Sequence, residues 1–143
     1  MRVMIVDDSK NMRRIVSNAL ESVPKLELHY AGNGEEAEAI LQENRVLGTP
    51  IDIVFLDWMM PKMSGFEFLK KIRSTEFFNQ SPRIIMLTAE TYSEQINACL
   101  KYGVSYYMTK PFTNEDILSS FQKVAKEVEA AVKTAVMEKN SAV

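Results

Sequence analysis

Short apolar runs alternate with amphipathic stretches along this chain of 143 residues. Several of the runs are apolar at almost every position and rich in β-branched or aromatic residues, which is typical of strands buried on both faces. The five runs cover residues 3–6, 26–30, 51–56, 83–87 and 104–108. The run at 26–30 alternates apolar and polar residues, so we expect it to form an edge strand with one wetter face.

Amphipathic stretches between these runs predict helices. In the first stretch, apolar residues from Met12 to Val23 recur at the i, i+3, i+4, i+7 spacing of a helix with one buried face, and Pro24 ends the pattern. The predicted N-caps of the first three helices are Ser9, Asn33 and Ser64.

The last two helices are marked by apolar spacing and by residues at their ends. The fourth helix carries Tyr92, Ile96, Cys99 and Leu100. Gly103 is suited to the left-handed position just after its end. The fifth helix begins near Thr113, with acidic residues in its first turn. Five strands that alternate with five helices indicate an α/β fold with a parallel sheet and helices on both faces.

Composition narrows the function classes. The chain is 46% hydrophobic and 25% charged with a net charge of −2, which fits one globular domain and argues against a general nucleic-acid binder. No apolar run reaches the roughly 18 residues of a membrane span, so we expect no membrane insertion and a cytoplasmic protein. A single cysteine, Cys99, and a single histidine, His29, disfavour disulfides, zinc sites and Ser-His-Asp triads.

Polar residues follow the predicted strands at their carboxyl ends. Asp7 and Asp8 follow the first run, Asp57 ends the third, Thr88 follows the fourth and Lys110 follows the fifth. Because the carboxyl ends of parallel strands meet at one edge of the sheet, we expect these side chains to converge there. The two remaining aspartates, Asp52 and Asp116, stand at the starts of elements and are expected to do boundary and capping work.

The predicted cluster suits phosphoryl transfer. Neighbouring carboxylates repel one another and are stabilised by a cation, and hard oxygen ligands favour Mg²⁺. Lys110 offers a point charge for a phosphate, and Thr88 offers a hydroxyl donor. A carboxylate nucleophile, a metal and donors for the phosphoryl oxygens are the components that phosphoryl transfer needs.

These residues, in this order and with Pro111 and Phe112 after Lys110, resemble the receiver domain of bacterial two-component response regulators. The likeness covers about residues 2–124, and segments 7–16 and 57–61 look closest to the stand-alone, CheY-like chemotaxis receivers. It implies a flavodoxin-like (βα)5 fold with strand order 2-1-3-4-5. The whole chain, 1–143, is then a single receiver domain with a helical extension at 125–143.

The resemblance also implies roles for the site residues. Asp57 is the phosphoacceptor and takes the phosphoryl group from a phosphohistidine of a histidine kinase. Asp8 and Asp57 ligate Mg²⁺ directly with the backbone carbonyl of Met59, and Asp7 acts mainly through water. Thr88 and Lys110 contact the acyl phosphate.

Two further positions belong to the implied switch. Thr88 is drawn toward the phosphate, and Tyr107 turns into the space that it leaves. This change alters the face formed by the fourth helix, the fifth strand and the fifth helix. The peptide bond before Pro111 is expected to be cis, which a tertiary amide permits.

The chain departs from the stand-alone receivers at two places. Met59 stands where they usually carry Asn, and its apolar side chain cannot position an attacking water. The apolar positions of the fifth helix continue past the usual end, at 117, 121, 124, 128, 131 and 135, with Leu118, Ala125 and Val132 alongside. We expect a helix over 114–138, about 37 Å long, whose end is either a solvent-exposed tail or a contact with a second copy or a partner.

The sequence therefore favours a phosphoacceptor switch that signals by protein contact, with the flagellar motor switch protein as the expected target. A phosphorelay intermediate is the alternative within the family. A phosphotransferase enzyme with an aspartate nucleophile is disfavoured, because such enzymes carry a second acid where Met59 stands here. Only self-catalysed phosphorylation and dephosphorylation are expected. A nucleotide- or flavin-binding module is disfavoured because acids replace the glycine-rich motif after the first strand.

Overall fold

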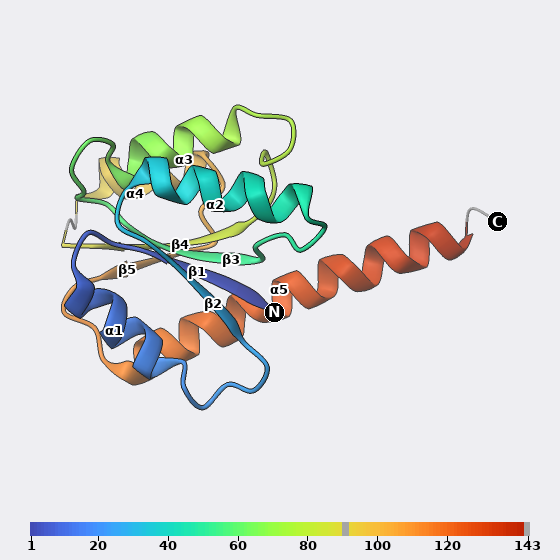
Figure 1. Ribbon diagram of the computed structural model, residues 1–143, viewed down its shortest axis with the longest axis horizontal. Coiled ribbons are helices and arrows are strands. Elements are labelled where there is room, and N and C mark those ends of the chain that lie inside the picture. The colour runs from blue at the N-terminus through green and yellow to red at the C-terminus, as the bar shows by residue number, and fades with distance from the viewer. Residues whose placement is uncertain (90–91, 142–143) are drawn as a thin grey trace.

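The computed structural model describes residues 1–89 and 92–141, which form a parallel sheet with helices on both faces (Figure 1). The strands are β1 (Arg2–Val6), β2 (Glu27–Ala31), β3 (Ile53–Asp57), β4 (Arg83–Thr88) and β5 (Tyr106–Thr109). The helices are α1 (Lys10–Ala19), α2 (Gly34–Val46), α3 (Gly65–Arg73), α4 (Ser93–Lys101) and α5 (Asn114–Ser141). The strand order is β2-β1-β3-β4-β5 with every pair parallel, which confirms the expected fold class.

The sheet is covered by α1 and α5 on one face and by α2, α3 and α4 on the other (Figure 1). Side chains of β3 alternate between two cores: Phe55 packs in the core with α1 and α5, whereas Val54 and Leu56 pack in the core with α2 and α3. Burial on both faces explains why the central strands are apolar at successive positions. Strand β2 lies at an edge of the sheet, as expected, and its Glu27 is exposed as the alternating pattern predicted. Tyr30, an apolar position of that pattern on the opposite face, is 46% exposed as well, because an edge strand is less covered on both faces.

Strands β2, β3 and β5 begin one or two residues later than the apolar runs do, whereas β1 begins one residue earlier and β4 begins at the same residue. Ile51 and Val104 are buried but precede the ladders of β3 and β5. The backbone N–H of Val104 donates to the carbonyl of Cys99 at the end of α4, and not to a neighbouring strand. Burial alone therefore does not mark the start of strand pairing.

The predicted helix caps are present. The side chains of Ser9, Asn33 and Ser64 accept hydrogen bonds from backbone N–H groups three residues later, at 3.2, 2.9 and 3.1 Å. At the start of α5, Thr113 and Asp116 each accept a hydrogen bond from the backbone of the other. Asp52 accepts a hydrogen bond from the backbone of Arg2 at 2.8 Å, where β1 begins.

Helix α4 is less deeply packed than its apolar spacing suggested. Cys99 is buried, but Tyr92 is 69% exposed and Leu100 is 52% exposed. Tyr92 is the N-cap and lies outside the helix, and Leu100 follows Cys99 directly, so it faces a different direction around the helix axis. Gly103 has φ of +80°, which confirms its place just after the helix.

Helix α5 is the longest element and extends beyond the sheet (Figure 1). It ends at Ser141, three residues after the expected end. Its first half is buried through Ile117, Phe121 and Val124, whereas every residue from 129 to 140 is exposed. We call residues 129–140 the arm. No helix in the described ranges is both long and apolar enough to cross a membrane.

Candidate functional site

Three carboxylates meet at the carboxyl edge of the sheet. Asp57 is the last residue of β3, and Asp7 and Asp8 follow β1, which pairs with β3 in parallel. Each of the three offers a carboxylate oxygen, and these oxygens lie within 4.8 Å of one another. Asp7 and Asp57 are buried while Asp8 is exposed, so the cluster is open to solvent on one side.

Asp7 is held in a setting that disfavours its charge. Its side chain accepts a hydrogen bond from the backbone of Ser9 at 2.9 Å through one oxygen. Its other oxygen, Oδ2, is buried, and no hydrogen-bond partner for it lies among the described residues. Removal from water raises the pKa of Asp7 to about 6, and the nearby charge of Asp57 also raises it.

Asp57, at the end of β3, faces Lys110, which follows β5. The Lys110 Nζ lies 3.2 Å from Oδ1 of Asp57, whose side chain is 5% exposed. Burial raises the pKa of Asp57, while the charge and hydrogen bond of Lys110 oppose that rise. The peptide bond between Lys110 and Pro111 is cis, and the backbone N–H of Lys110 donates to the carbonyl of Thr88 at 2.7 Å.

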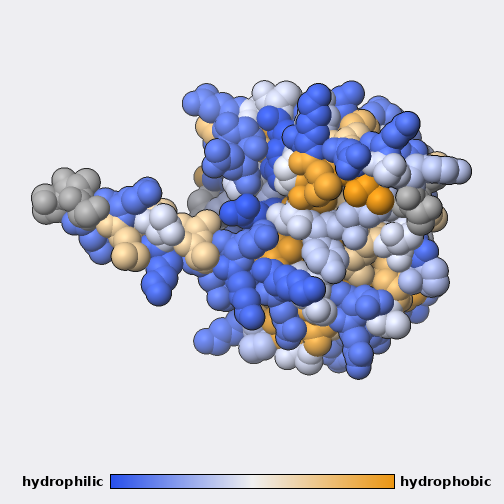
Figure 2. Space-filling model, turned by 180° about the vertical axis from the view of Figure 1, so that it is seen from behind, coloured by the Kyte–Doolittle hydropathy of each residue, from blue (hydrophilic) through white to orange (hydrophobic). Residues whose placement is uncertain are grey.

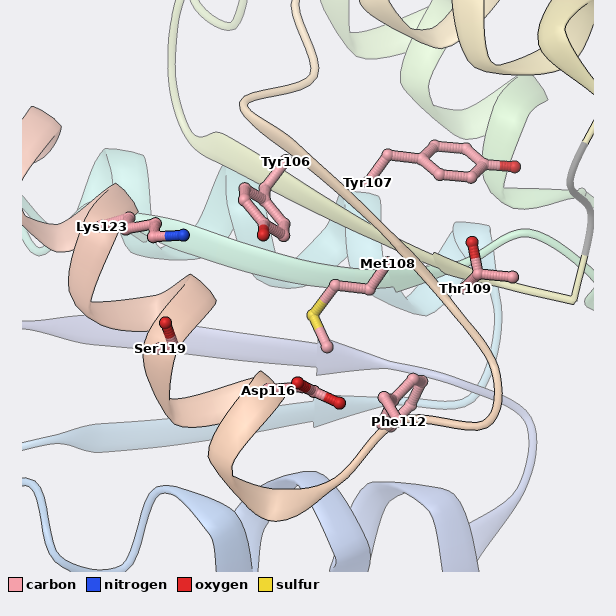
Figure 3. Close-up of a pocket in the computed structure, with 8 residues that line it drawn as sticks. All are labelled: Tyr106, Tyr107, Met108, Thr109, Phe112, Asp116, Ser119 and Lys123. Carbon is pink, nitrogen blue, oxygen red and sulfur yellow. The ribbon is translucent and has the colours of Figure 1, made fainter.

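Thr88 and Tyr107 lie on the same face of the sheet. Met86 and Tyr107 are register partners, and Thr88 is two residues beyond Met86, so strand alternation turns all three to the side of α3 and α4. Thr88 is buried at 1% exposure, and Tyr107 is half-buried. Tyr106 points the other way, toward Lys123 of α5, and lines a pocket between β5 and α5 (Figure 3).

The loop after β3 contains the exposed side chain of Met59. It is 66% exposed and two residues after Asp57, which accepts a hydrogen bond from the Met59 backbone. Trp58 stacks on Phe66 with ring centroids 5.1 Å apart, and this contact holds the loop against α3. The predicted site residues thus come together at this edge of the sheet, with two exceptions. Tyr107 lies within β5, before its carboxyl end, and Pro111 lies in the loop that follows β5.

Two residues that support the site were missed by the sequence reasoning. A Cβ added at Gly65 would lie 2.1 Å from the carbonyl oxygen of Asp57, so only glycine permits this approach of α3 to β3. Arg13 Nη1 donates to the backbone carbonyl of Asp7 at 2.5 Å. The sequence held a signal for Gly65, because a glycine stands directly after the predicted N-cap Ser64. No sequence pattern indicated that the Arg13 side chain points toward the Asp7 carbonyl.

The donor set fits a hard divalent cation. Three carboxylates within reach of one another, one of them with a buried and unpartnered oxygen, are the oxygen ligands that Mg²⁺ prefers. Among the residues that the structure describes, Lys110 is the one basic side chain that forms an ion pair with this cluster, and it contacts Asp57. The arrangement is therefore suited to hold a metal beside a phosphoryl group.

Comparisons with known proteins point to one family. The model of the response regulator receiver domain matches residues 3–122. A chemotaxis protein CheY homolog of Campylobacter jejuni is 35% identical over 124 residues, which cover 87% of this chain and 92% of that protein.

Solved structures agree with this match. The structure of chemotaxis protein CheY4 of Vibrio cholerae is 35% identical, with a TM-score of 0.74, and the match covers 86% of this chain and 97% of that chain. A CheX–CheY–BeF3–Mg complex of Borrelia burgdorferi contains a chain that is 30% identical, with a TM-score of 0.74 and coverage of 87% and 88%. The chain therefore belongs to the response regulator receiver domain family, as a CheY-like phosphoacceptor signalling switch.

Proposed function

We propose that this protein takes a phosphoryl group from a histidine kinase onto Asp57 and that Mg²⁺ at the carboxylate cluster assists the transfer. The observation that carries the proposal is the set of three convergent carboxylates with Lys110 placed 3.2 Å from Asp57. We take residues 2–124 as the receiver and the helix from 125 to 141 as its extension, and we place the protein in the cytoplasm. The last two residues of the extension expected at 125–143 lie outside the described residues.

The chemistry follows from the buried carboxylate. An oxygen of Asp57 forms a bond to phosphorus as the bond between phosphorus and the imidazole nitrogen of the donor breaks, and the imidazole leaves. Asp7, Asp8 and Asp57, with the backbone carbonyl of Met59, would hold the metal, which neutralises phosphoryl and carboxylate charge when bound. Lys110 stabilises charge on the phosphoryl oxygens, and Thr88 donates its hydroxyl to one of them. Hydrolysis of the acyl phosphate by water, on the same residues, resets the switch.

The output is a change on the face of α4, β5 and α5. A phosphorylated aspartate carries additional charge and strong acceptor oxygens, which attract the hydroxyl of Thr88. Because Thr88 and Tyr107 share a face of the sheet, movement of Thr88 frees space into which Tyr107 turns. The ligand biases an equilibrium between two states, and a partner binds one of them more tightly.

The partner that we propose for this face is the flagellar motor switch protein. Exposed Tyr92 just before α4, exposed Leu100 on α4, and the pocket lined by Tyr106 and Lys123 give this face apolar and polar contact points. In the Borrelia burgdorferi complex, a relative of this chain is bound to CheX. Like those CheY-like relatives, this chain is expected to act through protein contact, with no turnover of external substrates.

The test is phosphotransfer from a phosphorylated histidine kinase or a small phosphodonor, with and without Mg²⁺. We expect one phosphate per chain with Mg²⁺ present and at least a ~100-fold slower reaction without it or in Asp57→Asn. Asp52→Asn is the matched control, because Asp52 bonds the backbone of Arg2 away from the site and should leave the rate unchanged. Full-rate labelling of Asp57→Asn would overturn the assignment of the phosphoacceptor.

A further inference from the structure

The arm carries apolar side chains beyond the body of the receiver. The apolar spacing that buries Ile117, Phe121 and Val124 continues on the same side of α5 through Val128, Ala131 and Ala135. Beside these positions, Val132 is 59% exposed and Val136 is 53% exposed. An isolated helix as short as the arm is marginally stable in water, and most helices are stabilised by packing an apolar face against a neighbour. The apolar side of the arm therefore suggests a packing partner.

A groove runs between the arm and the body. Its volume is about 740 Å³. The arm contributes the small side chains of Ala130, Ala131, Thr134 and Ala135 together with Glu138, and α5 adds Glu127 just before the arm. The body contributes Arg83 and the segment before β5, residues 103–105. Figure 2 shows the arm projecting from the body, with pale orange apolar residues between blue hydrophilic ones along the face in view. Because Ala130, Ala131 and Ala135 have small side chains, the backbone of another helix can approach the arm closely there.

We propose that a second copy of this chain occupies the groove, with the arm of each copy lying in the groove of the other. The groove runs alongside the arm, so an occupant that is itself a helix of the arm's length would fit along it. The arm of a second copy is such a helix. A two-fold arrangement fills both recesses at once and leaves no free recess for further growth. This inference does not depend on the proposed phosphoryl transfer.

The charges of the arm region fit self-association. From 126 to 140 there are three lysines and three glutamates, namely Lys126, Lys133, Lys139, Glu127, Glu129 and Glu138. Their charges sum to zero, whereas nucleic acid or an anionic membrane would select a basic helix. A second copy brings the same balanced set and meets no net repulsion.

The available area is that of a weak dimer. The arm is about 18 Å long and about 10 Å across, so its lateral surface is about 570 Å². If half of each arm is buried, together with an equal area of the recess that receives it, the two copies bury about 1,100 Å² in total. This is just below the ~1,200–2,000 Å² that specific, stable interfaces bury, so we expect weak association with a dissociation constant of about 10–100 μM.

The experiment is sedimentation of the full chain from about 5 to about 500 μM. Ala135→Glu puts a charge into the groove, and Met137→Glu adds the same charge on nearly the opposite side of the arm, where Met137 is 62% exposed. We expect wild type and Met137→Glu to dimerise with dissociation constants within ~2-fold, and Ala135→Glu to bind at least ~10-fold more weakly.

The helix content of each variant is measured by circular dichroism, so that loss of the arm helix is separated from loss of the contact. Wild type that remains monomeric over the whole concentration range would overturn the proposal. Equal weakening by Ala135→Glu and Met137→Glu would overturn it as well, because it would show that charge rather than the groove governs association.

Discussion

Replacing Asp7 by Asn should stabilise the protein when no divalent cation is present. Asn has the shape of Asp and can still accept the hydrogen bond from the backbone of Ser9, but it brings no charge into the buried site. Asp7 has its pKa raised from 3.8 to about 6, chiefly by burial. The folded state therefore holds a proton on Asp7 that the unfolded state has released between these two pH values. The free energy of unfolding of the wild type falls as pH rises through this window.

The size of the effect follows from the shift. One pKa unit corresponds to about 1.4 kcal/mol, so the rise from 3.8 to about 6 destabilises the wild type by about 3 kcal/mol above pH 7. The same arithmetic gives about 1.6 kcal/mol at about pH 5 and less than about 1 kcal/mol at about pH 4. Asp7→Asn should be more stable than wild type by these amounts.

Urea unfolding with a chelator present, at about pH 4, 5 and 7.5, measures the difference. Glu21→Gln is the control, because it removes one exposed carboxylate near α1 and should change the free energy of unfolding by less than about 0.5 kcal/mol. Saturating Mg²⁺ should then stabilise wild type by about 2.7 kcal/mol at 100 times its dissociation constant, and Asp7→Asn by less. If Asp7→Asn is no more stable than wild type at about pH 7.5, or if the gap does not shrink toward pH 4, the account of Asp7 is wrong.

Two further substitutions test the surroundings of Asp57. Met59→Asn supplies a polar group that can orient a water beside the acyl phosphate and should shorten the phosphate half-life by ~3-fold or more. The control Met137→Asn, at an exposed position on the arm, should leave the half-life unchanged. An unchanged half-life in Met59→Asn would contradict this interpretation of the exposed Met59 side chain. Gly65→Ala places a methyl group 2.1 Å from the carbonyl oxygen of Asp57 and should cost at least ~3 kcal/mol in unfolding free energy. Gly48→Ala, where φ is +75° and no atom lies within 4 Å of the added Cβ, should cost only ~1–2 kcal/mol, and equal losses would argue against the close approach of α3.

Most of the fold could be predicted from local patterns. The apolar runs located the strands to within two residues, because buried parallel strands need apolar side chains on both faces. The caps Ser9, Asn33 and Ser64 were predictable because a helix N-terminus has free N–H groups that a short polar side chain satisfies locally. The strand order came from the likeness to known receivers, since periodicity by itself does not say which strands are neighbours.

By itself the sequence determined which residues could carry the chemistry: Asp7, Asp8 and Asp57 stand at strand ends, and parallel strands end at one edge. Only the tertiary structure decided how these carboxylates differ. Asp7 and Asp57 are buried and Asp8 is exposed, because burial depends on which loops and helices close over each side chain. The close approach at Gly65 and the unpartnered oxygen of Asp7 likewise depend on groups that are distant in the chain. The apolar pattern of α5 predicted a long helix. Where its burial stops depends on how far the sheet extends beneath it, so only the tertiary structure shows that the arm begins at 129.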